Sequence, residues 1–510
     1  MAHPKPTEID PRAPKPNSES FERDIWVKEA GFREYDARWL YPEQINLRGI
    51  QSLGMALGSM VKSRYSDKPS IVVGHDYRAY SAHIKMALIT GLMAAGCDVK
   101  DIGLALSPVA YFAQFALDCL SVAMVTASHN ENGWTGVKMG MERPLTFGPE
   151  LMSELKERTI NQNWTLCGGG SYEVIEGMKD RYLDDLTRNV KLAHRLKVVA
   201  ACGNGTAGAY APEALRRIGC EVIELDCDLD HSFPHYNPNP EDMEMLHVLS
   251  RKVKETGADV GLAFDGDGDR CGVVDNTGEE IFADKMGVIL ARDLAAQYPG
   301  ADFPHAQFVA DVKSTGLFAS DPVLKSFGAK TDYWKTGHSY LKRRVNELGA
   351  LAGFEKSGHY FFNAPIGKGY DDGVLSAITV CRLLDRHPGQ SLADLKNALP
   401  KTWGSPTMAP FCPDDKKYRV VERVTAHYQS LYDRGEKILG QSIENVVTVN
   451  GVRVTLADGT WGLIRASSNV PSLVVVVESP VSEAQTRAMF AELDATLSQF
   501  PEVGEYNQKF

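Results

Sequence analysis

Three aspartates separated by single glycines form the segment of this chain whose chemistry is easiest to infer. Residues 265–270 have the sequence Asp-Gly-Asp-Gly-Asp-Arg. Mg²⁺ prefers a few carboxylates together with phosphate oxygens and water, and the guanidinium of Arg270 is a fork that suits phosphate. We therefore expect Asp265, Asp267 and Asp269 to hold Mg²⁺ in a site for phosphoryl transfer.

A calcium loop of the EF-hand type also begins with alternating aspartates. That loop needs Gly at its sixth position and Glu at its twelfth, where this chain has Arg270 and Asn276. Apolar, β-prone runs at 260–264 and 271–274 flank the aspartates, so we expect them at a strand end or a hairpin tip. A solvated Asp-Gly hairpin turn without a ligand is the remaining alternative.

A serine follows another predicted strand. Residues 122–126, Val-Ala-Met-Val-Thr, are typical of a buried strand and lead into Ala127, Ser128, His129 and Asn130. A strand that ends in a serine can present a nucleophile, and His129 or Lys138 could act as a base or bind phosphate. A turn-capping serine is the alternative, whereas a Ser-His-Asp hydrolase is disfavoured because no G-x-S-x-G motif is present.

Two further loops carry groups that bind polar ligands. Residues 353–359, Gly-Phe-Glu-Lys-Ser-Gly-His, place glutamate, serine and histidine on a glycine-flanked loop that suits sugar hydroxyls. Residues 465–471, Arg-Ala-Ser-Ser-Asn-Val-Pro, offer a guanidinium, hydroxyls and backbone N–H groups for an anion. Taken alone, each loop could also be an ordinary surface turn.

The elements that must position these loops follow an α/β pattern. A helix, a glycine stop and a strand recur at Gly96, Gly219 and Gly328. The pattern predicts three tandem mixed α/β domains of similar topology and, beyond Pro406, an α+β domain of another kind. The expected ranges are a disordered Pro-rich tail at 1–24, α/β domains at 25–176, 177–285 and 286–403, and the last domain at 404–510.

Composition narrows the class of protein. The 510 residues are 43% apolar, which can fill the cores of several domains. A net charge of −11 and a pI near 5.7 argue against nucleic-acid and anionic-membrane partners. The nine cysteines form no CxxC pair, and no signal peptide or membrane-length apolar run is found. We therefore expect a cytoplasmic enzyme with reduced thiols.

Taken together, the four loops resemble those of the α-D-phosphohexomutase superfamily. In the family's order and one per domain, 126–130 is similar to its phosphoserine loop, 265–270 to its metal loop, 353–359 to its sugar loop and 465–471 to its phosphate loop. Finer similarities to the bacterial phosphomannomutase/phosphoglucomutase branch lie at 32–38, 74–78, 311–313 and 334–339. The resemblance implies four domains around a central cleft, the last one TATA-box-binding-protein-like, in a monomer or weak homodimer.

The same resemblance implies a reaction. Ser128 would carry a phosphate, complete the Mg²⁺ site, and exchange phosphate with mannose or glucose phosphates between O1 and O6. A hexose 1,6-bisphosphate would be both intermediate and activator. Lys138 or His359 would be the general base, and Arg38, His129 and Arg270 would offset charge. The substrate would bind Tyr35, Lys313, His338, Glu355, Ser357, Arg465, Ser467, Ser468 and Asn469.

The chain departs from the family pattern at three places. Glu131 stands where Pro is usual, Phe354 lies inside the sugar loop, and residues 468–470 replace the usual Asn-Thr-Thr or Asn-Thr-Glu. These differences leave the preferred sugar open, including the glucosamine of phosphoglucosamine mutases. A phosphatase using the same serine and metal is one alternative. A non-catalytic sugar-phosphate sensor on the same scaffold is another, although such a protein would have lost Ser128 or a metal aspartate, and this chain has all four.

Overall fold

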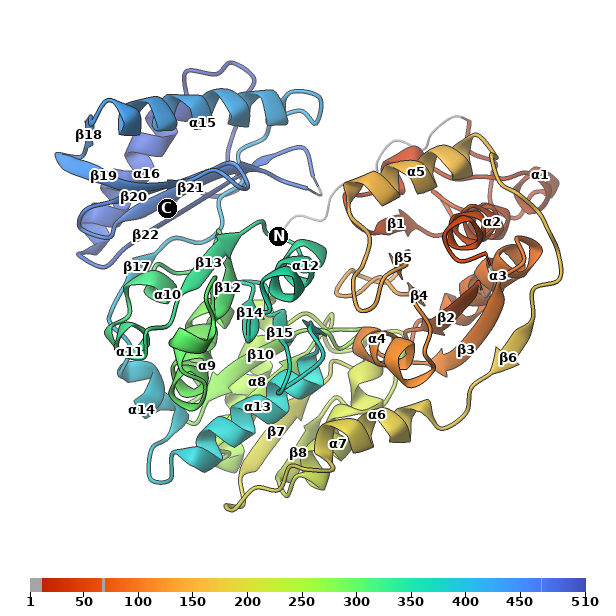
Figure 1. The fold of residues 1–510 in the computed structure, drawn as a ribbon, viewed down its shortest axis with the longest axis horizontal. Coiled ribbons are helices and arrows are strands. Elements are labelled where there is room, and N and C mark those ends of the chain that lie inside the picture. Colours follow the sequence, from red (N-terminus) through yellow and green to blue (C-terminus); the bar gives the residue numbers. More distant parts are fainter. Residues whose placement is uncertain (1–11, 67–68, 469) are drawn as a thin grey trace. The chain divides into compact units, whose positions relative to one another are not determined.

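The computed structural model describes residues 12–66, 69–468 and 470–510. Two compact units divide the chain. The first contains Met1–Glu280 and Tyr370–Pro388, and the second contains Ile281–Gly369 and Gly389–Phe510. The described residues form four sheets, and each unit contains two of them apart from short strands at the unit boundaries (Figure 1).

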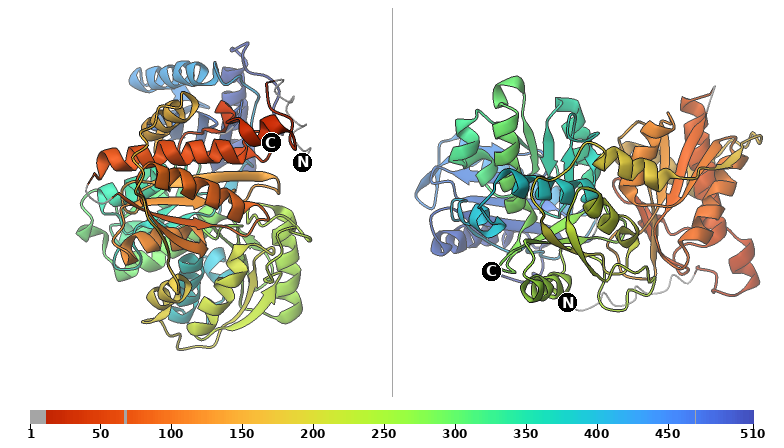
Figure 2. Two further views of the ribbon diagram at one scale, coloured as in Figure 1. Left: turned by 90° about the vertical axis from the view of Figure 1, so that its right-hand side faces the viewer. Right: turned by 90° about the horizontal axis from the view of Figure 1, so that it is seen from below.

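The first sheet of the first unit is mixed. Its strands lie in the order β1 (Ala37–Leu40), β5 (Trp134–Gly140), β4 (Ser121–Val125), β2 (Ser70–His75), β3 (Asp98–Leu104) and β6 (Tyr172–Val174). Strand β2 is parallel to β3 and β4, whereas β5 is antiparallel to β1 and β4. The helices around it are α2 (Leu47–Arg64), α3 (Ser81–Ala94), α4 (Ser107–Ala116) and α5 (Pro149–Ile160) (Figures 1 and 2).

Helices α2 and α3 pack very closely, and glycines make this possible. A Cβ on Gly54 would lie 2.3 Å from the Leu88 carbonyl oxygen, and one on Gly91 would lie 2.2 Å from that of Gln51. Both helices bury apolar residues in one cluster with the strands, including Leu57 of α2. This packing fixes the strands from which the serine loop emerges.

The second sheet of the first unit carries the aspartate loop. Its strands lie in the order β11 (Glu280–Ile281), β10 (Cys271–Asp275), β9 (Val260–Phe264), β7 (Lys197–Ala201) and β8 (Glu221–Leu225). Strands β9 and β10 are antiparallel and pair Phe264 with Cys271, so the aspartates do lie at a hairpin tip. The helices are α6 (Met178–Thr187), η2 (Thr206–Ala209), α7 (Ala211–Arg217) and α8 (Met243–Thr256).

The range expected for the third domain, 286–403, includes a segment that lies in the first compact unit. Strand β16 (Tyr370–Asp371) and helix α13 (Gly373–Arg386) belong to the first unit. Asp372 caps α13 by accepting from Leu375 N, and Tyr182 Oη donates to both of its carboxylate oxygens at 2.9 and 3.0 Å. The N–H of Gly373 donates to the Gly268 carbonyl of the aspartate loop at 3.0 Å. These buried polar contacts hold the segment in the first unit.

Within the range expected for a disordered tail, 1–24, the structure describes residues 12–24 and includes a short helix there. Residues 1–11 lie outside the described residues. Helix α1 (Glu19–Arg23) follows, with Phe21 buried and its carbonyl accepting from Asn46 Nδ2 at 2.6 Å. The buried side chain of Phe21 anchors this short helix to the domain. The polar residues around Phe21 in the sequence give no indication of this contact.

The third sheet lies in the second unit. Strands β13 (Thr331–Trp334), β12 (Phe308–Asp311), β14 (Ala352–Phe354) and β15 (Tyr360–Phe362) lie in that order, with β12 parallel to both neighbours and β15 antiparallel to β14. The helices of this region are α9 (Ala283–Gln297), η3 (Gly300–Asp302), α10 (Leu317–Ser320), α11 (Pro322–Ser326), α12 (His338–Leu348) and α14 (Leu392–Asn397).

The fourth sheet is antiparallel between all of its neighbouring strands. Its order is β17 (Trp403–Gly404), β22 (Leu473–Ser479), β21 (Trp461–Ala466), β20 (Val452–Leu456), β19 (Gln441–Val447) and β18 (Lys437–Ile438). Helices α15 (Lys417–Asp433) and α16 (Glu483–Leu497) share a core cluster with it. The predicted fold class, three mixed α/β domains and a different C-terminal domain, is confirmed. In the described part of the chain, no helix combines the length and apolarity that a bilayer crossing requires.

Candidate active site

The serine loop begins where β4 ends. Ser128 is buried at 1% exposure and has a positive φ of +52°. Its N–H donates to Thr126 Oγ1 at 2.8 Å, and the Thr126 N–H donates to the Gly136 carbonyl of β5 at 3.1 Å. The backbone turns sharply at Ser128. The direction of its side chain is therefore not the one that the alternation of a continuing β4 strand would give.

The aspartate loop closes the β9–β10 hairpin. Gly268 has φ +71°, a conformation that favours glycine, and its N–H donates to the Asp265 carbonyl at 3.1 Å. The three aspartates are fully buried, and one carboxylate oxygen of each lies within 4.8 Å of the others. Among the residues that the structure describes, Asp267 Oδ1 has no hydrogen-bond partner although it is buried. A converging, buried, all-oxygen set of this kind fits a hard divalent cation.

The first unit brings the serine and the aspartates together. Ser128 Oγ donates to Asp265 Oδ2 at 3.0 Å and lies 3.3 Å from His129 Nδ1. Ser107 Oγ, at the start of α4, donates to Asp267 Oδ2 at 2.6 Å. The hydroxyl is therefore held beside the carboxylates that could bind a cation.

Lys138 on β5 pairs with two of these carboxylates. Its Nζ lies 2.7 Å from Asp267 Oδ2 and also donates to Asp269 Oδ2. Burial acts to lower the pKa of Lys138, but Asp267 and Asp269 outweigh burial and raise that pKa well above its ordinary value. Lys138 in this arrangement is a proton-holding cation.

The crowded carboxylates have opposite pKa shifts. Burial, and then the charges of Asp269 and Asp267, raise the pKa of Asp265 well above its ordinary value. Burial would also raise the pKa of Asp267, but Lys138 and the Ser107 hydroxyl reverse this effect and lower it. Asp265 is therefore the carboxylate whose negative charge is least favourable, and a cation bound beside it would relieve this cost.

Two arginines predicted to offset charge lie around the same loops. Arg38 Nε donates to Asp36 Oδ2 at 2.9 Å, and its Nη1 donates to the Ala127 carbonyl at 2.9 Å and to Asn130 Oδ1. Arg270 Nη1 donates to Glu241 Oε2 at 2.8 Å, and its Nε is 3.8 Å from Asp265 Oδ2. Tyr35 is half-buried in the turn before β1.

The predicted sugar-binding residues lie in the second unit. His338, at the start of α12, stacks on His359 with ring centroids 5.6 Å apart. Glu355 and Ser357 are buried in the β14–β15 turn, where the N–H of Glu355 donates to the His359 carbonyl at 3.0 Å. Lys313 is half-buried just after β12. The turn thus brings Glu355, His359 and His338 into one cluster.

The predicted phosphate loop joins β21 to β22 in the same unit. Arg465 is buried at the end of β21, with Nη1 donating to the Ala466 carbonyl at 2.8 Å. The N–H of Ser467 donates to the Ser472 carbonyl at 3.0 Å, and Ser468 is half-buried. Asn469 lies outside the described residues. Lys417, which sequence reasoning missed, donates to the Val470 carbonyl at 3.1 Å.

Sequence reasoning also assigned no role to several groups around Ser128. Asp76 and Arg78 were noted only as part of a family similarity at 74–78, yet both contact the serine loop. A charged motif directly after a predicted strand was the available indication. Ser107 had no indication in the sequence, because only the tertiary fold brings α4 to the aspartate loop.

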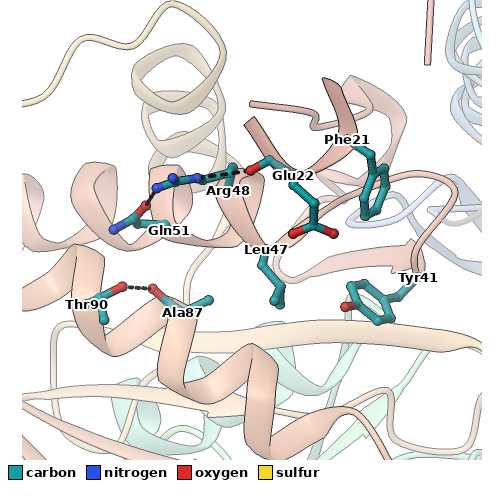
Figure 3. A pocket seen from close by; sticks show the side chains of 8 residues that line it. All are labelled: Phe21, Glu22, Tyr41, Leu47, Arg48, Gln51, Ala87 and Thr90. Carbon is teal, nitrogen blue, oxygen red and sulfur yellow. Dashed lines mark hydrogen bonds between the residues drawn. The ribbon is translucent and has the colours of Figure 1, made fainter. Parts of the chain in front are cut away.

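A separate pocket of about 320 Å³ lies between α1, α2 and α3 (Figure 3). Phe21, Tyr41 and Leu47 supply its apolar side, and Arg48, which donates to Gln51 Oε1 at 3.2 Å, lies at its polar side. None of the predicted site residues lines it. The pocket is therefore not part of the predicted phosphoryl-transfer site, and we assign no function to it.

Comparisons with known proteins identify the family of this chain. Models of the phosphoglucomutase/phosphomannomutase family match alpha/beta/alpha domain I at 29–165, domain II at 180–278, domain III at 282–403 and the C-terminal domain at 412–496. The chain is 37% identical over 448 residues to a phosphomannomutase/phosphoglucomutase of Pseudomonas putida, covering 88% of this chain and 91% of that protein.

Two more relatives extend the match. The chain is 36% identical over 456 residues to the phosphomannomutase/phosphoglucomutase of Pseudomonas aeruginosa PAO1, covering 89% of this chain and 93% of that protein. A crystal structure of a phosphoglucomutase/phosphomannomutase family protein from Burkholderia thailandensis superposes with a TM-score of 0.82 at 32% identity, covering 93% of this chain and 98% of that one. The resemblance inferred from the four loops is confirmed: the chain belongs to the phosphoglucomutase/phosphomannomutase family and is a phosphohexomutase.

Proposed function

We propose that this enzyme interconverts the 1- and 6-phosphates of mannose and of glucose through a phosphate carried on Ser128. The observation that carries the proposal is the buried Ser128 hydroxyl, 3.0 Å from Asp265 Oδ2 within a set of three buried aspartates. A serine in that position can hold a phosphoryl group next to a cation. Relatives named phosphomannomutase/phosphoglucomutase at 36–37% identity support the choice of sugars.

Asp265, Asp267 and Asp269 would hold Mg²⁺ together with the phosphate on Ser128. When bound, the ion would neutralise charge on the transferring phosphoryl group. Lys138, which pairs with Asp267 and Asp269, would add positive charge beside the same group. Arg270 and His129 would contact the same group, and Arg38 would hold the loop that presents it.

The sequence of events requires two phosphoryl transfers. The phosphate on Ser128 would pass to the free hydroxyl of a hexose monophosphate, giving a hexose 1,6-bisphosphate, and the other phosphate would return to Ser128. The general base would be Lys138 or His359. Glu355 and Ser357 would bind the 3- and 4-hydroxyls that glucose and mannose share, with Tyr35, Lys313 and His338 as further contacts. Arg465, Ser467, Ser468 and Asn469 would bind the far phosphate.

A coupled assay tests the proposal. Purified enzyme is given mannose 1-phosphate, glucose 1-phosphate or glucosamine 1-phosphate with Mg²⁺ and a trace of glucose 1,6-bisphosphate, and 6-phosphate and free phosphate are both measured. We expect 6-phosphates from mannose and glucose without phosphate release. Preference for glucosamine would indicate a phosphoglucosamine mutase, net phosphate release a phosphatase, and binding without turnover a sensor. Any of these three results would overturn the proposal.

A further inference from the structure

The backbone of Ser128 needs an explanation beyond the reaction itself. Its φ of +52° lies in the left-handed region, which is strained for a residue with a Cβ. Such a conformation persists only where surrounding contacts hold it. Thr126 Oγ1, which accepts from the Ser128 N–H at 2.8 Å, fixes one side of the peptide chain at this residue. The carbonyl side requires another partner.

Arg78 supplies that partner. Its Nη2 donates to the Ser128 carbonyl at 3.1 Å and to the Asn130 carbonyl at 2.6 Å, so one guanidinium nitrogen joins both ends of the turn. The Arg78 side chain is only 1% exposed, and its guanidinium lies 5.4 Å from the centre of the Phe233 ring. Hydrogen bonds from a charged donor in such a buried place are stronger than neutral ones.

Asp76 fixes Arg78 and the start of the same loop. Its side chain is fully buried, and Oδ2 accepts from Arg78 Nη1, from Thr126 Oγ1 at 2.9 Å and from the Ala127 N–H at 3.3 Å. Its Oδ1 accepts from Ser81 Oγ at 2.6 Å. Burying an ion pair is costly and adds little stability by itself. The hydrogen bonds of this pair instead hold residues 126–130 in place.

The Ser128 carbonyl also determines how the serine loop meets the aspartate loop. A Cβ on Gly266 would lie 2.5 Å from the Ser128 carbonyl oxygen, so the two loops touch at this point. Arg78 therefore holds the oxygen that lies against the aspartate loop. A rotation of this peptide would displace both the carbonyl and the hydroxyl that faces Asp265.

We propose that Asp76 and Arg78 are positioning residues that lock Ser128 in its left-handed conformation and so aim its hydroxyl at the aspartate site. The inference rests on the proposed role of Ser128 as phosphate carrier. Neither residue contacts the substrate in this scheme, so their loss reduces kcat and leaves KM for hexose phosphates nearly unchanged. A misplacement on the order of 1 Å at a reacting group costs about 100-fold in rate.

Two variants of Arg78 test the proposal. Arg78→Lys keeps a charge that can pair with Asp76, but an ammonium lacks the planar fork that contacts the aspartate and the carbonyls together. We expect its kcat to fall about 10- to 100-fold, with KM within about threefold of that of the wild type, since the far-phosphate contacts are intact. The kcat of Arg78→Ala should fall further than that of Arg78→Lys. Millimolar guanidinium in the assay should restore part of this kcat by occupying the space that the arginine side chain leaves.

Lys85→Met is the matched control. Lys85 donates to both carboxylate oxygens of Asp101 at 2.7 and 2.6 Å in another buried ion pair of the same unit, away from the serine loop. Its removal should lower the thermal midpoint but leave kcat unchanged. If Arg78→Ala does not fold, Arg78→Lys decides the question. A folded Arg78→Lys with wild-type kcat, or an Arg78→Ala that folds but gains nothing from guanidinium, would overturn the proposal.

Intact-mass analysis of the wild type separates this inference from the proposed function. Absence of phosphate on Ser128 in an active enzyme would refute the phosphate-carrier role itself. Phosphate on Ser128 of the wild type, together with unaltered turnover in Arg78→Lys, would refute only the positioning role. The two failures therefore give different results.

Discussion

Ser128 Oγ lies 3.0 Å from Asp265 Oδ2, although the two residues are 137 positions apart and follow strands of different sheets. The contact makes one site of two loops that the sequence presents separately. Because the pKa of Asp265 is raised by burial and by its neighbouring aspartates, the serine proton or a cation is a favoured partner for it. The predictions below follow from this arrangement and from the contacts around it.

The phosphate carrier can be identified by mass. Freshly isolated enzyme should contain a fraction heavier by one phosphate, and this fraction should be missing from Ser128→Ala, which should also lose mutase activity. Ser121→Ala, a buried serine of the same β4 strand, serves as the control and should keep both. Phosphate retained in Ser128→Ala would assign the carrier to another residue.

Metal binding can be tested at Asp267, whose Oδ1 is buried without a partner among the described residues. Chelation should abolish activity and Mg²⁺ should restore it, because few other ligands are available. Mg²⁺ should also raise the thermal midpoint of the wild type, since binding to the folded state stabilises it. Asp267→Asn should lose this thermal shift and most turnover.

Asp118→Asn is the control for the metal test, because the side chain of Asp118 is 92% exposed. It should respond to Mg²⁺ as the wild type does. Full activity of the wild type in excess chelator would contradict the metal role.

Glu478 should make the stability of the second unit pH-dependent. It is buried on β22 and accepts from Lys285 Nζ at 2.8 Å, Gly316 N at 2.8 Å and Trp461 Nε1 at 3.1 Å. Although burial opposes the shift, Lys285 and these hydrogen bonds lower its pKa from 4.5 to about 2. A shift of that size corresponds to about 3 kcal/mol. Because the folded-state pKa is depressed, the stabilisation is complete above pH 4.5 and disappears as the pH falls toward 2.

Thermal unfolding of the wild type and of Glu478→Gln at several pH values checks this prediction. The variant should be less stable at pH 7, and the difference should narrow as the pH falls below 4.5. Glu483→Gln, which removes a half-exposed partner of Arg487, should show no such trend. A difference that is constant over the whole range would contradict the assignment of the effect to Glu478 ionisation.

Arg465 should anchor phosphate rather than read the sugar ring. If its guanidinium binds the far phosphate, Arg465→Ala should raise KM for mannose and glucose phosphates by a similar factor, since the contact does not depend on the C2 configuration. Loss of a charge-assisted contact costs roughly 1.5 to 3 kcal/mol, or about 10- to 150-fold. Steady-state kinetics on both sugars gives the answer, with Arg487→Ala on the exposed face of α16 as the control. A loss confined to one sugar would show that Arg465 reads the ring.

The sequence by itself determined the local features of the site. The β9–β10 hairpin with aspartates at its tip follows from apolar runs that flank Asp-Gly repeats, and the serine loop follows from an apolar strand that ends at Val125. These patterns depend on residues close in the chain, so they can be read without a structure. The order of four such loops was enough to identify the family.

Only the tertiary structure decided which distant groups meet. Lys138 pairs with Asp267 and Asp269 because the two sheets of the first unit bring their loops together. Arg78 donates to the Ser128 carbonyl because β2 and β4 are neighbours in one sheet. Helix α13 joins that unit although the chain reaches it through the second, and no local pattern marks the change. Side-chain pairing and pKa shifts of this kind arise from burial and close packing, and these depend on contacts between residues far apart in the sequence.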